Sequence, residues 1–238
     1  MTIDDKFVAI VPAAGSGARL GAPLPKQYVE LARQPMIYHC LRAFAQVDRI
    51  DQTYVLLHPD DSIWETLDRT CFAGRVTALR CGGETRADTV RGGLAMLGRS
   101  VDADHWVLVH DAARPLIAAA AINTLIDALA RDAVGGLLAL PVADTVKREQ
   151  DGRVVQTVAR DHLWLAQTPQ MFHYGLLREA LARAAEHSIT DEAQAVEAMG
   201  LKPRLVHGDA RNFKITYPQD LALAESLLGG HPLDKEIL

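Results

Sequence analysis

The sequence predicts an α/β fold: a single Rossmann-like domain in which a mainly parallel mixed sheet is flanked by helices, with a protruding β-hairpin arm. Segments typical of strands and of helices alternate along the chain, as they do in βαβ units. The first, residues 8–11, is an apolar run rich in β-branched side chains, typical of a strand buried on both faces of a parallel sheet. Further on, Asp151-Gly152 joins two polar strand patterns and predicts a hairpin.

Length and composition limit the class of protein. With 238 residues, 49% of them hydrophobic and 23% charged, the chain is long enough for one α/β domain with a sizeable core. No long stretch lacks charge, which excludes a membrane-spanning segment, and a formal net charge of −5 argues against a nucleic-acid-binding surface. Residues 1–6 lack the core of a signal peptide, and three cysteines without metal-ligand spacing indicate free thiols in a reducing cytoplasm.

The elements after residues 8–11 follow in alternation. Apolar runs predict further strands at 53–57, 76–79, 106–109, 136–141 and 163–166. Apolar side chains that recur on one helical face predict helices at 37–44, 90–97, 122–129 and 174–186.

Two more helices are predicted from their capping signals. Thr190, followed by two acidic residues, is expected to cap a helix that begins there. Residues 216–219 resemble a capping box with an early proline, which opens a last helix running to Leu228. Residues 229–238 show no clear pattern, and we expect a mobile tail there.

The segment at about 142–162 departs from the alternation. Its two polar strands, joined at Asp151-Gly152, offer little apolar surface, and an isolated hairpin is only marginally stable in water. We therefore expect this arm to pack on a surface outside its own sheet, for which a two-fold partner is the simplest candidate. The alternative is a solvated surface hairpin.

A loop of small residues follows the first strand and is the main functional signal. From Pro12 the chain reads Pro-Ala-Ala-Gly-Ser-Gly, and two glycines without bulky neighbours let backbone N–H groups approach an anion, most often a phosphate. Arg19 and Lys26 add positive charge just beyond the loop. We interpret the segment as a binding loop for a nucleoside triphosphate; the alternative is an ordinary tight connection between a strand and a helix.

Two common phosphate-binding motifs do not match this loop. The dinucleotide fingerprint needs a third glycine where Leu20 stands, and the strand at 53–57 is followed by His58-Pro59 rather than by an acidic residue for a ribose. No Gly-Lys-Ser/Thr sequence follows the loop either, as a P-loop requires. A dehydrogenase and a P-loop enzyme are therefore disfavoured.

Two later segments add candidate ligand groups. Gly82-Gly83 separates a predicted strand from a helix, so its backbone could lie against a planar base while the Thr89 hydroxyl meets the base edge. Asp111 and Arg114 follow the strand at 106–109, and open α/β sheets bind ligands at the carboxyl ends of their strands. The acid could hold a ribose hydroxyl, a metal or an acceptor hydroxyl, and the arginine a phosphate. Alternatively, the two form an ion pair that only stabilises the loop.

The motif Pro12-Ala-Ala-Gly-Ser-Gly-x-Arg-Leu-Gly21, followed by Pro25-Lys-Gln-Tyr28, resembles the signature of nucleotidyltransferases that activate sugar or polyol phosphates. More narrowly, it is similar to the 2-C-methyl-D-erythritol 4-phosphate cytidylyltransferase family. Ala18 departs from the pattern, since many members carry a second basic residue there. The resemblance extends over residues 7–228, because later blocks agree in order and spacing: residues 110–115, 144–145, 160, 167–170, 190–192 and 212–216.

The resemblance implies a set of site residues. The catalytic residues would be Arg19, Lys26 and Lys214. The residues that bind CTP would be Pro12, Ala13, Ala14, Gly15, Gly17, Gly82, Glu84, Thr89 and Asp111. The residues that bind the acceptor would be Asp111, Arg114, Thr145, Arg160, Thr168, Thr190 and Lys214. Whether Arg160 and Thr190 serve their own subunit or a partner's is left open.

The resemblance also implies the reaction and its partners. One nucleotidyltransferase domain, 1–238, would transfer CMP from CTP to the phosphate of 2-C-methyl-D-erythritol 4-phosphate, a step in isoprenoid precursor synthesis. Mg²⁺ would be held mainly by the CTP phosphates, near Asp111. A homodimer would form through the arm, with no nucleic acid or membrane partner. Two alternatives remain: a ribitol 5-phosphate cytidylyltransferase, and a protein that binds CTP without turnover.

Overall fold

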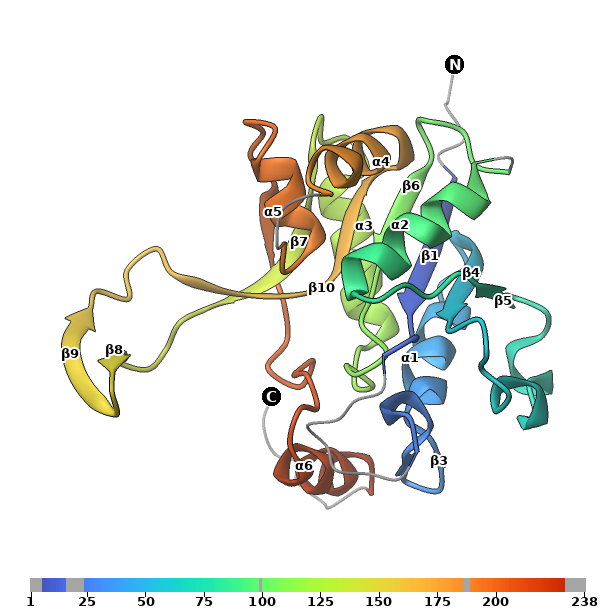
Figure 1. Cartoon of the computed structure of the whole chain (residues 1–238), viewed down its shortest axis with the longest axis horizontal. Helices are drawn as coiled ribbons and strands as arrows, with labels where there is room; N and C mark the ends of the chain where they lie inside the picture. Colours follow the sequence, from blue (N-terminus) through green and yellow to red (C-terminus); the bar gives the residue numbers. More distant parts are fainter. Residues whose placement is uncertain (1–5, 16–23, 99, 186–188, 230–238) are drawn as a thin grey trace.

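A seven-stranded mixed sheet forms the centre of the protein (Figure 1). The computed structural model describes residues 6–15, 24–98, 100–185 and 189–229. β10 pairs antiparallel with both of its neighbours, and the other pairings in this sheet are parallel, as the sequence predicts. From one edge to the other, the strands are β11 (Arg204–His207), β7 (Gly135–Pro141), β10 (Trp164–His173), β6 (Trp106–Val109), β1 (Phe7–Pro12), β4 (Ile50–Leu57) and β5 (Val76–Arg80).

Helices cover both faces of the sheet. The core on one face includes α1 (Met36–Ala45) and α3 (Ala119–Leu129), and the core on the other includes α2 (Arg86–Leu97), α4 (Tyr174–Arg183) and α5 (Glu192–Glu197). α6 (Pro218–Leu228) packs separately, with Leu31, Met36 and Ile215. The short elements are β2 (Glu30–Leu31), β3 (Gln34–Pro35) and the 3-10 helices Lys26–Tyr28, Trp64–Thr66 and Thr70–Phe72.

β1 is buried on both faces, as its apolar run predicts. Its side chains alternate between the two cores: Ala9 and Val11 belong to the core with α1 and α3, whereas Val8 and Ile10 belong to the core with α2 and α4. A strand between two parallel neighbours and two helical layers has no polar face to present, so apolar residues occupy every position.

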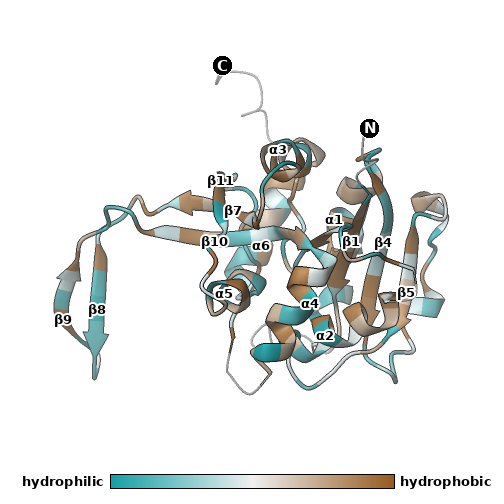
Figure 2. Ribbon diagram, turned by 90° about the horizontal axis from the view of Figure 1, so that it is seen from above, coloured by the Kyte–Doolittle hydropathy of each residue, from teal (hydrophilic) through white to brown (hydrophobic). Residues whose placement is uncertain are grey.

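The predicted arm is present and projects away from the sheet (Figure 1). β8 (Val146–Gln150) and β9 (Arg153–Val158) form an antiparallel pair of their own, and Figure 2 shows them as mainly hydrophilic. Asp151 and Gly152 both have positive φ, 51° and 75°, as a type I′ hairpin turn requires. Val154 and Val155 on β9 are 64% and 55% exposed, so apolar side chains of the arm lie uncovered in a single copy of the chain.

The structure lengthens or adds several strands. β4 begins at Ile50 rather than at 53, and β11 was not predicted. β10 runs on through residues 167–170, a mostly polar stretch that includes the predicted acceptor residue Thr168, with a break in register between Ala166 and Gln170. These polar side chains are buried in the sheet, where an apolar pattern cannot signal them.

Both predicted helix caps are wrong in detail. Asp191, not Thr190, is the N-cap of α5, because its carboxylate accepts the N–H of Gln194 at 3.0 Å. At α6, the carboxylate of Asp220 accepts the N–H groups of Thr216 and Tyr217, each at 2.8 Å, so this residue and not Gln219 closes the turn.

Two further predictions extend past the residues that the structure describes. α4 ends at Arg183, before the predicted residue 186, which lies outside the described residues. The expected tail, apart from Gly229, also lies outside them. Among the described helices, none is both long and apolar enough to cross a membrane.

Candidate active site

A cavity of about 580 Å³ opens beyond the carboxyl ends of β1, β4 and β6. This is where open α/β sheets bind ligands. It is lined by Pro12, Ala13, Ala14, Gly15, Lys26, Gln27, His58, Gly83, Glu84, Thr85, Arg86, Thr89, Asp111, Ala112, Ala113, Lys214 and Thr216.

The loop after β1 is held against the sheet by two hydrogen bonds. Ala13 N–H donates to the Leu56 carbonyl at 2.8 Å, and the buried Gln27 amide donates to the Ala13 carbonyl at 2.6 Å. Both backbone polar groups of Ala13 are thus paired, which fixes the start of the loop at the cavity wall. Gly17 and Arg19, two predicted site residues, lie outside the described residues.

Gly82 allows this loop to approach the segment that precedes α2. A Cβ at Gly82 would lie 2.4 Å from the Ala14 Cβ and 2.9 Å from the His58 Cα, too close for any side chain without a backbone shift. Gly82 itself does not line the cavity, whereas Gly83 and Glu84 do. Gly82 thus keeps the two loops close together, and its role in binding CTP stays a prediction.

Thr89 lines the cavity, but its hydroxyl is engaged within the loop. The hydroxyl donates to the Thr85 carbonyl at 3.0 Å and accepts the Gly83 N–H at 3.1 Å, and the residue is 2% exposed. The hydroxyl thus holds Gly83 in place and keeps one lone pair for a further hydrogen bond, so its predicted contact with a base edge stays a prediction.

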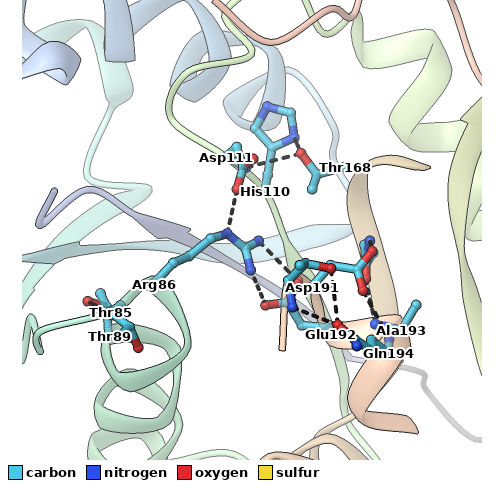
Figure 3. Close-up of polar contacts among 12 residues, drawn as sticks. Thr85, Arg86, Thr89, His110, Asp111, Thr168, Asp191, Glu192, Ala193 and Gln194 are labelled. Carbon is cyan, nitrogen blue, oxygen red and sulfur yellow. Dashed lines mark hydrogen bonds and ion pairs between the residues drawn. The ribbon is translucent and has the colours of Figure 1, made fainter. Parts of the chain in front are cut away.

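Four charged side chains alternate in sign along one chain of contacts beside the cavity. Arg86 donates to Asp111 at 2.7 Å and, through both terminal nitrogens, to Glu192 at 2.6 and 3.0 Å (Figure 3). The other oxygen of Asp111 contacts the Lys214 ammonium at 2.7 Å. Burial alone would raise the pKa of the Asp111 carboxyl, but the charges and hydrogen bonds of Arg86 and Lys214 hold it well below its usual range. Asp111 is therefore ionised at neutral pH.

Lys26 and Lys214 face the same cavity from distant parts of the chain. The Lys26 ammonium donates to the carbonyl of Ile215, the residue after Lys214. Ile215 is in turn fixed by its N–H, which donates to the Ala113 carbonyl at 2.9 Å. These contacts place two ammonium groups and the loop after β6 around one space, which suits a polyanionic ligand.

His110 and Thr168 support the loop from behind. The Thr168 hydroxyl accepts the Asp111 N–H at 3.1 Å and lies 3.1 Å from the His110 Nδ1 (Figure 3). The His110 Nε2 lies 3.0 Å from the Arg114 carbonyl. Burial lowers the pKa of His110 to about 4, against the opposing effects of the Arg114 carbonyl and of Asp111. The ring is thus neutral, donating from Nε2 and accepting at Nδ1. Thr168 does not line the cavity.

The remaining predicted acceptor residues do not line the cavity. The Arg114 guanidinium donates to the carbonyls of Asn212 and Ala166, at 2.7 and 3.2 Å. Thr145 and Arg160 are exposed at the base of the arm, where Arg160 donates to the Ala143 carbonyl. Thr190 is exposed beside α5 and contacts Gln194. The arm carries its residues away from the sheet, so sequence spacing alone does not bring them to the pocket.

Arg86 and Glu192 are the main residues that sequence reasoning missed. Arg86 follows Gly82-Gly83, and Glu192 belongs to the block 190–192 that agrees with the family, but the sequence predicts no role in the site for either side chain. The Glu192 side chain is 1% exposed. No local pattern distinguishes a buried, paired glutamate from a solvated one, so the agreement of residues 190–192 with the family is the signal that could have found it.

A metal ion in this cavity would need oxygen atoms of a bound substrate in addition to the protein's own carboxylates. Glu84 and Asp111 are the carboxylates among its described lining residues, and Asp111 already has both oxygens in ion pairs. Mg²⁺ bound with one or two carboxylates and several substrate oxygens fits this donor set. A group of Asp102, Asp104 and His105 lies before β6, at the opposite end of that strand from the cavity.

The fold and the cavity define an α/β protein with a candidate site for a polyanionic ligand at the carboxyl edge of a mainly parallel sheet. The model of the family "IspD: 2-C-methyl-D-erythritol 4-phosphate cytidylyltransferase" matches residues 7–230. The chain belongs to this family.

Individual relatives agree with this assignment. The 2-C-methyl-D-erythritol 4-phosphate cytidylyltransferase of Nitrosomonas eutropha is 52% identical over 226 residues, 94% of this chain and 97% of the relative. A crystal structure of 4-diphosphocytidyl-2C-methyl-D-erythritol synthase is 43% identical, with a TM-score of 0.83 over 94% of this chain and 98% of the other. The Francisella tularensis cytidylyltransferase structure is 32% identical, with a TM-score of 0.79 over 93% and 99%.

Proposed function

We propose that this protein transfers CMP from CTP to 2-C-methyl-D-erythritol 4-phosphate, giving 4-diphosphocytidyl-2-C-methyl-D-erythritol and pyrophosphate. An oxygen of the acceptor phosphate attacks the α-phosphorus of CTP, and the bond from that phosphorus to the bridging oxygen of the β-phosphate breaks. The product enters isoprenoid precursor synthesis. The supporting observation is that Lys26 and Lys214, 188 residues apart in the sequence, line one cavity in a member of this family.

Positioning and charge neutralisation are the main demands of this reaction. The acceptor phosphate is already ionised at neutral pH, so no strong general base is needed, but two polyanions must be brought together. In our proposal Lys26 and Lys214 neutralise the α-phosphoryl oxygens as charge develops there. Arg19 and the N–H groups of Gly15 and Gly17 hold the triphosphate.

We assign the CTP base to the cavity wall formed by the loop after β1 and the segment that precedes α2. Pro12, Ala13, Ala14, Glu84 and Thr89 all line the cavity there. In this proposal the backbone of Ala13, Ala14 and Gly83 distinguishes cytosine from uracil by its exocyclic amine, and Asp111 lies near the ribose and the reacting groups. Gly82 and Thr89 keep these backbone groups in place.

Mg²⁺ is the proposed cofactor, held mainly by the phosphates of CTP with Glu84 and Asp111 the nearest cavity carboxylates. When bound, it neutralises charge on the triphosphate. Asp111 also has a role that needs no metal, since its carboxylate fixes both Arg86 and Lys214.

We further propose that the active form is a homodimer. The arm offers exposed valines and no packed partner in its own subunit's sheet, and it carries Thr145 and Arg160 at its base. Packing of the arm on a second copy would allow Arg160, together with Thr190, to complete an acceptor pocket with Arg114 and Thr168. The single nucleotidyltransferase domain would act in the cytoplasm, where Cys40, Cys71 and Cys81 remain free thiols.

The test measures pyrophosphate release from CTP with Mg²⁺ and either 2-C-methyl-D-erythritol 4-phosphate or ribitol 5-phosphate. We expect release with the first acceptor alone. Release with ribitol 5-phosphate alone would overturn the acceptor assignment while leaving the transfer chemistry. If folded protein binds CTP but releases pyrophosphate with neither acceptor, the protein is a CTP-binding protein without this activity.

A further inference from the structure

Glu192 is a fully buried charge close to the cavity but not part of its wall. Its side chain is 1% exposed, and it does not belong to the residues that line the cavity. Both of its oxygens accept from the two terminal nitrogens of Arg86, at 2.6 and 3.0 Å (Figure 3). A bidentate contact of this kind fixes the plane of the guanidinium as well as its position.

The orientation of Arg86 determines which oxygen of Asp111 is available to Lys214. With its terminal nitrogens on Glu192, Arg86 has only its Nε directed at Asp111, on Oδ1 at 2.7 Å. Oδ2 of Asp111 is thereby left to Lys214, also at 2.7 Å. The contacts run Glu192, Arg86, Asp111, Lys214, with alternating charge, from the buried start of α5 to an ammonium in the cavity.

Glu192 is itself held firmly. The side-chain amide of the buried Gln170 on β10 brackets it, donating to Asp191 at 2.9 Å and accepting the N–H of Ala193 at 2.7 Å. The residues on both sides of Glu192 are thus tied to the central sheet. The position of the Glu192 carboxylate is therefore fixed, and Arg86, Asp111 and Lys214 follow from it in a chain of contacts.

We propose that Glu192 is a positioning residue that sets the Lys214 ammonium in the cavity through Arg86 and Asp111. Without the carboxylate, the planar fork of Arg86 turns to its remaining acceptor and takes both oxygens of Asp111. Lys214 then loses the oxygen that holds it. The inference rests on the proposed function in one respect, the use of Lys214 in the transfer reaction.

The kinetic test is a double-mutant cycle between Glu192→Gln and Lys214→Ala, with kcat and KM measured for both substrates. We expect Glu192→Gln to lower kcat/KM about tenfold in the wild-type background, but less than about threefold when Lys214 is already alanine, because the two changes remove the same interaction. Glu197→Gln is the matched control, since Glu197 is exposed on the same helix. Equal losses in both backgrounds, or no loss in the wild type, would overturn the proposal.

A second measurement needs no turnover. Acetic anhydride acylates lysine ammonium groups that lose their proton, and peptide mapping gives the rate at Lys214. We expect Glu192→Gln to raise this rate at least about threefold over the Glu197→Gln control, because the ion pair with Asp111 is weakened. An unchanged rate refutes the positioning role, whereas an inactive wild type with a raised rate refutes the proposed function alone. If Glu192→Gln does not fold, Glu192→Asp enters both tests; its carboxylate is one methylene too short for the bidentate contact, so we expect changes in the same direction but smaller, and no change in either test would overturn the proposal.

Discussion

His110 should make the stability of this protein fall as the pH drops from 7 to 5. The ring is fully buried, accepts from the Thr168 hydroxyl at Nδ1 and donates from Nε2 to the Arg114 carbonyl. A second ring proton, on Nδ1, would point at the Thr168 hydroxyl, which would then have to accept this hydrogen bond rather than donate it. The folded pKa, about 4, lies below the ordinary 6.5. The unfolded chain therefore binds more protons, and acid favours it.

The magnitude follows from the two pKa values. The stabilising effect is complete above about pH 6.5, declines as the pH falls toward 4, and amounts to about 3 kcal/mol in total at 1.36 kcal/mol per pKa unit. Between pH 7 and pH 5 the expected loss is about 2 kcal/mol. This window lies above the range in which the ordinary carboxylates titrate.

The assay is urea unfolding of the wild type and of His110→Gln at pH 7 and pH 5. The variant will be less stable at pH 7, but it has no ring to protonate, so the wild type should lose about 2 kcal/mol more than the variant between the two pH values. His58→Gln, at an exposed histidine, should behave as the wild type does. Parallel losses in wild type and His110→Gln would refute the assignment of a neutral, buried imidazole.

Three other changes test the site and the arm. Lys26→Ala should lower kcat by about 10²–10³ while the protein stays folded, because it removes one charged donor from the cavity; wild-type turnover in this variant contradicts the assignment. Gly82→Ala should cost about 1–3 kcal/mol in urea unfolding and weaken CTP binding measured by calorimetry, since its Cβ meets Ala14 at 2.4 Å. Gly15→Ala, whose Cβ meets nothing within 4 Å, is the control for stability, and equal stabilities in the two variants would show that the loops can separate freely. Val154→Asp combined with Val155→Asp should shift the protein from dimer to monomer in sedimentation experiments, and an unchanged dimer means that the arm is not the interface.

The fold could be predicted largely because its signals are local. The apolar run of β1 and the Asp151-Gly152 turn are each specified by a few consecutive residues, and both predictions are confirmed. The polar half of β10 and the cap of α5 were missed for the opposite reason. Gln170 is buried in a strand, where its side chain bonds to Asp191 and Ala193 at the start of α5. Asp191 caps that helix in place of Thr190 because residue 191 has the extended backbone of an N-cap, with φ −153° and ψ 176°, and its carboxylate accepts the Gln194 N–H.

The sequence by itself determined the alternation of strands and helices, the loop after β1 and the family, since these depend on patterns read along the chain. Only the tertiary structure decided which charges act together. Arg86 and Glu192 are 106 residues apart, yet they share two hydrogen bonds, while Arg114, expected to bind phosphate, donates to two backbone carbonyls in this structure. The partners of a charged side chain, and hence its burial and its chemistry, are set by elements that meet only when the sheet is assembled.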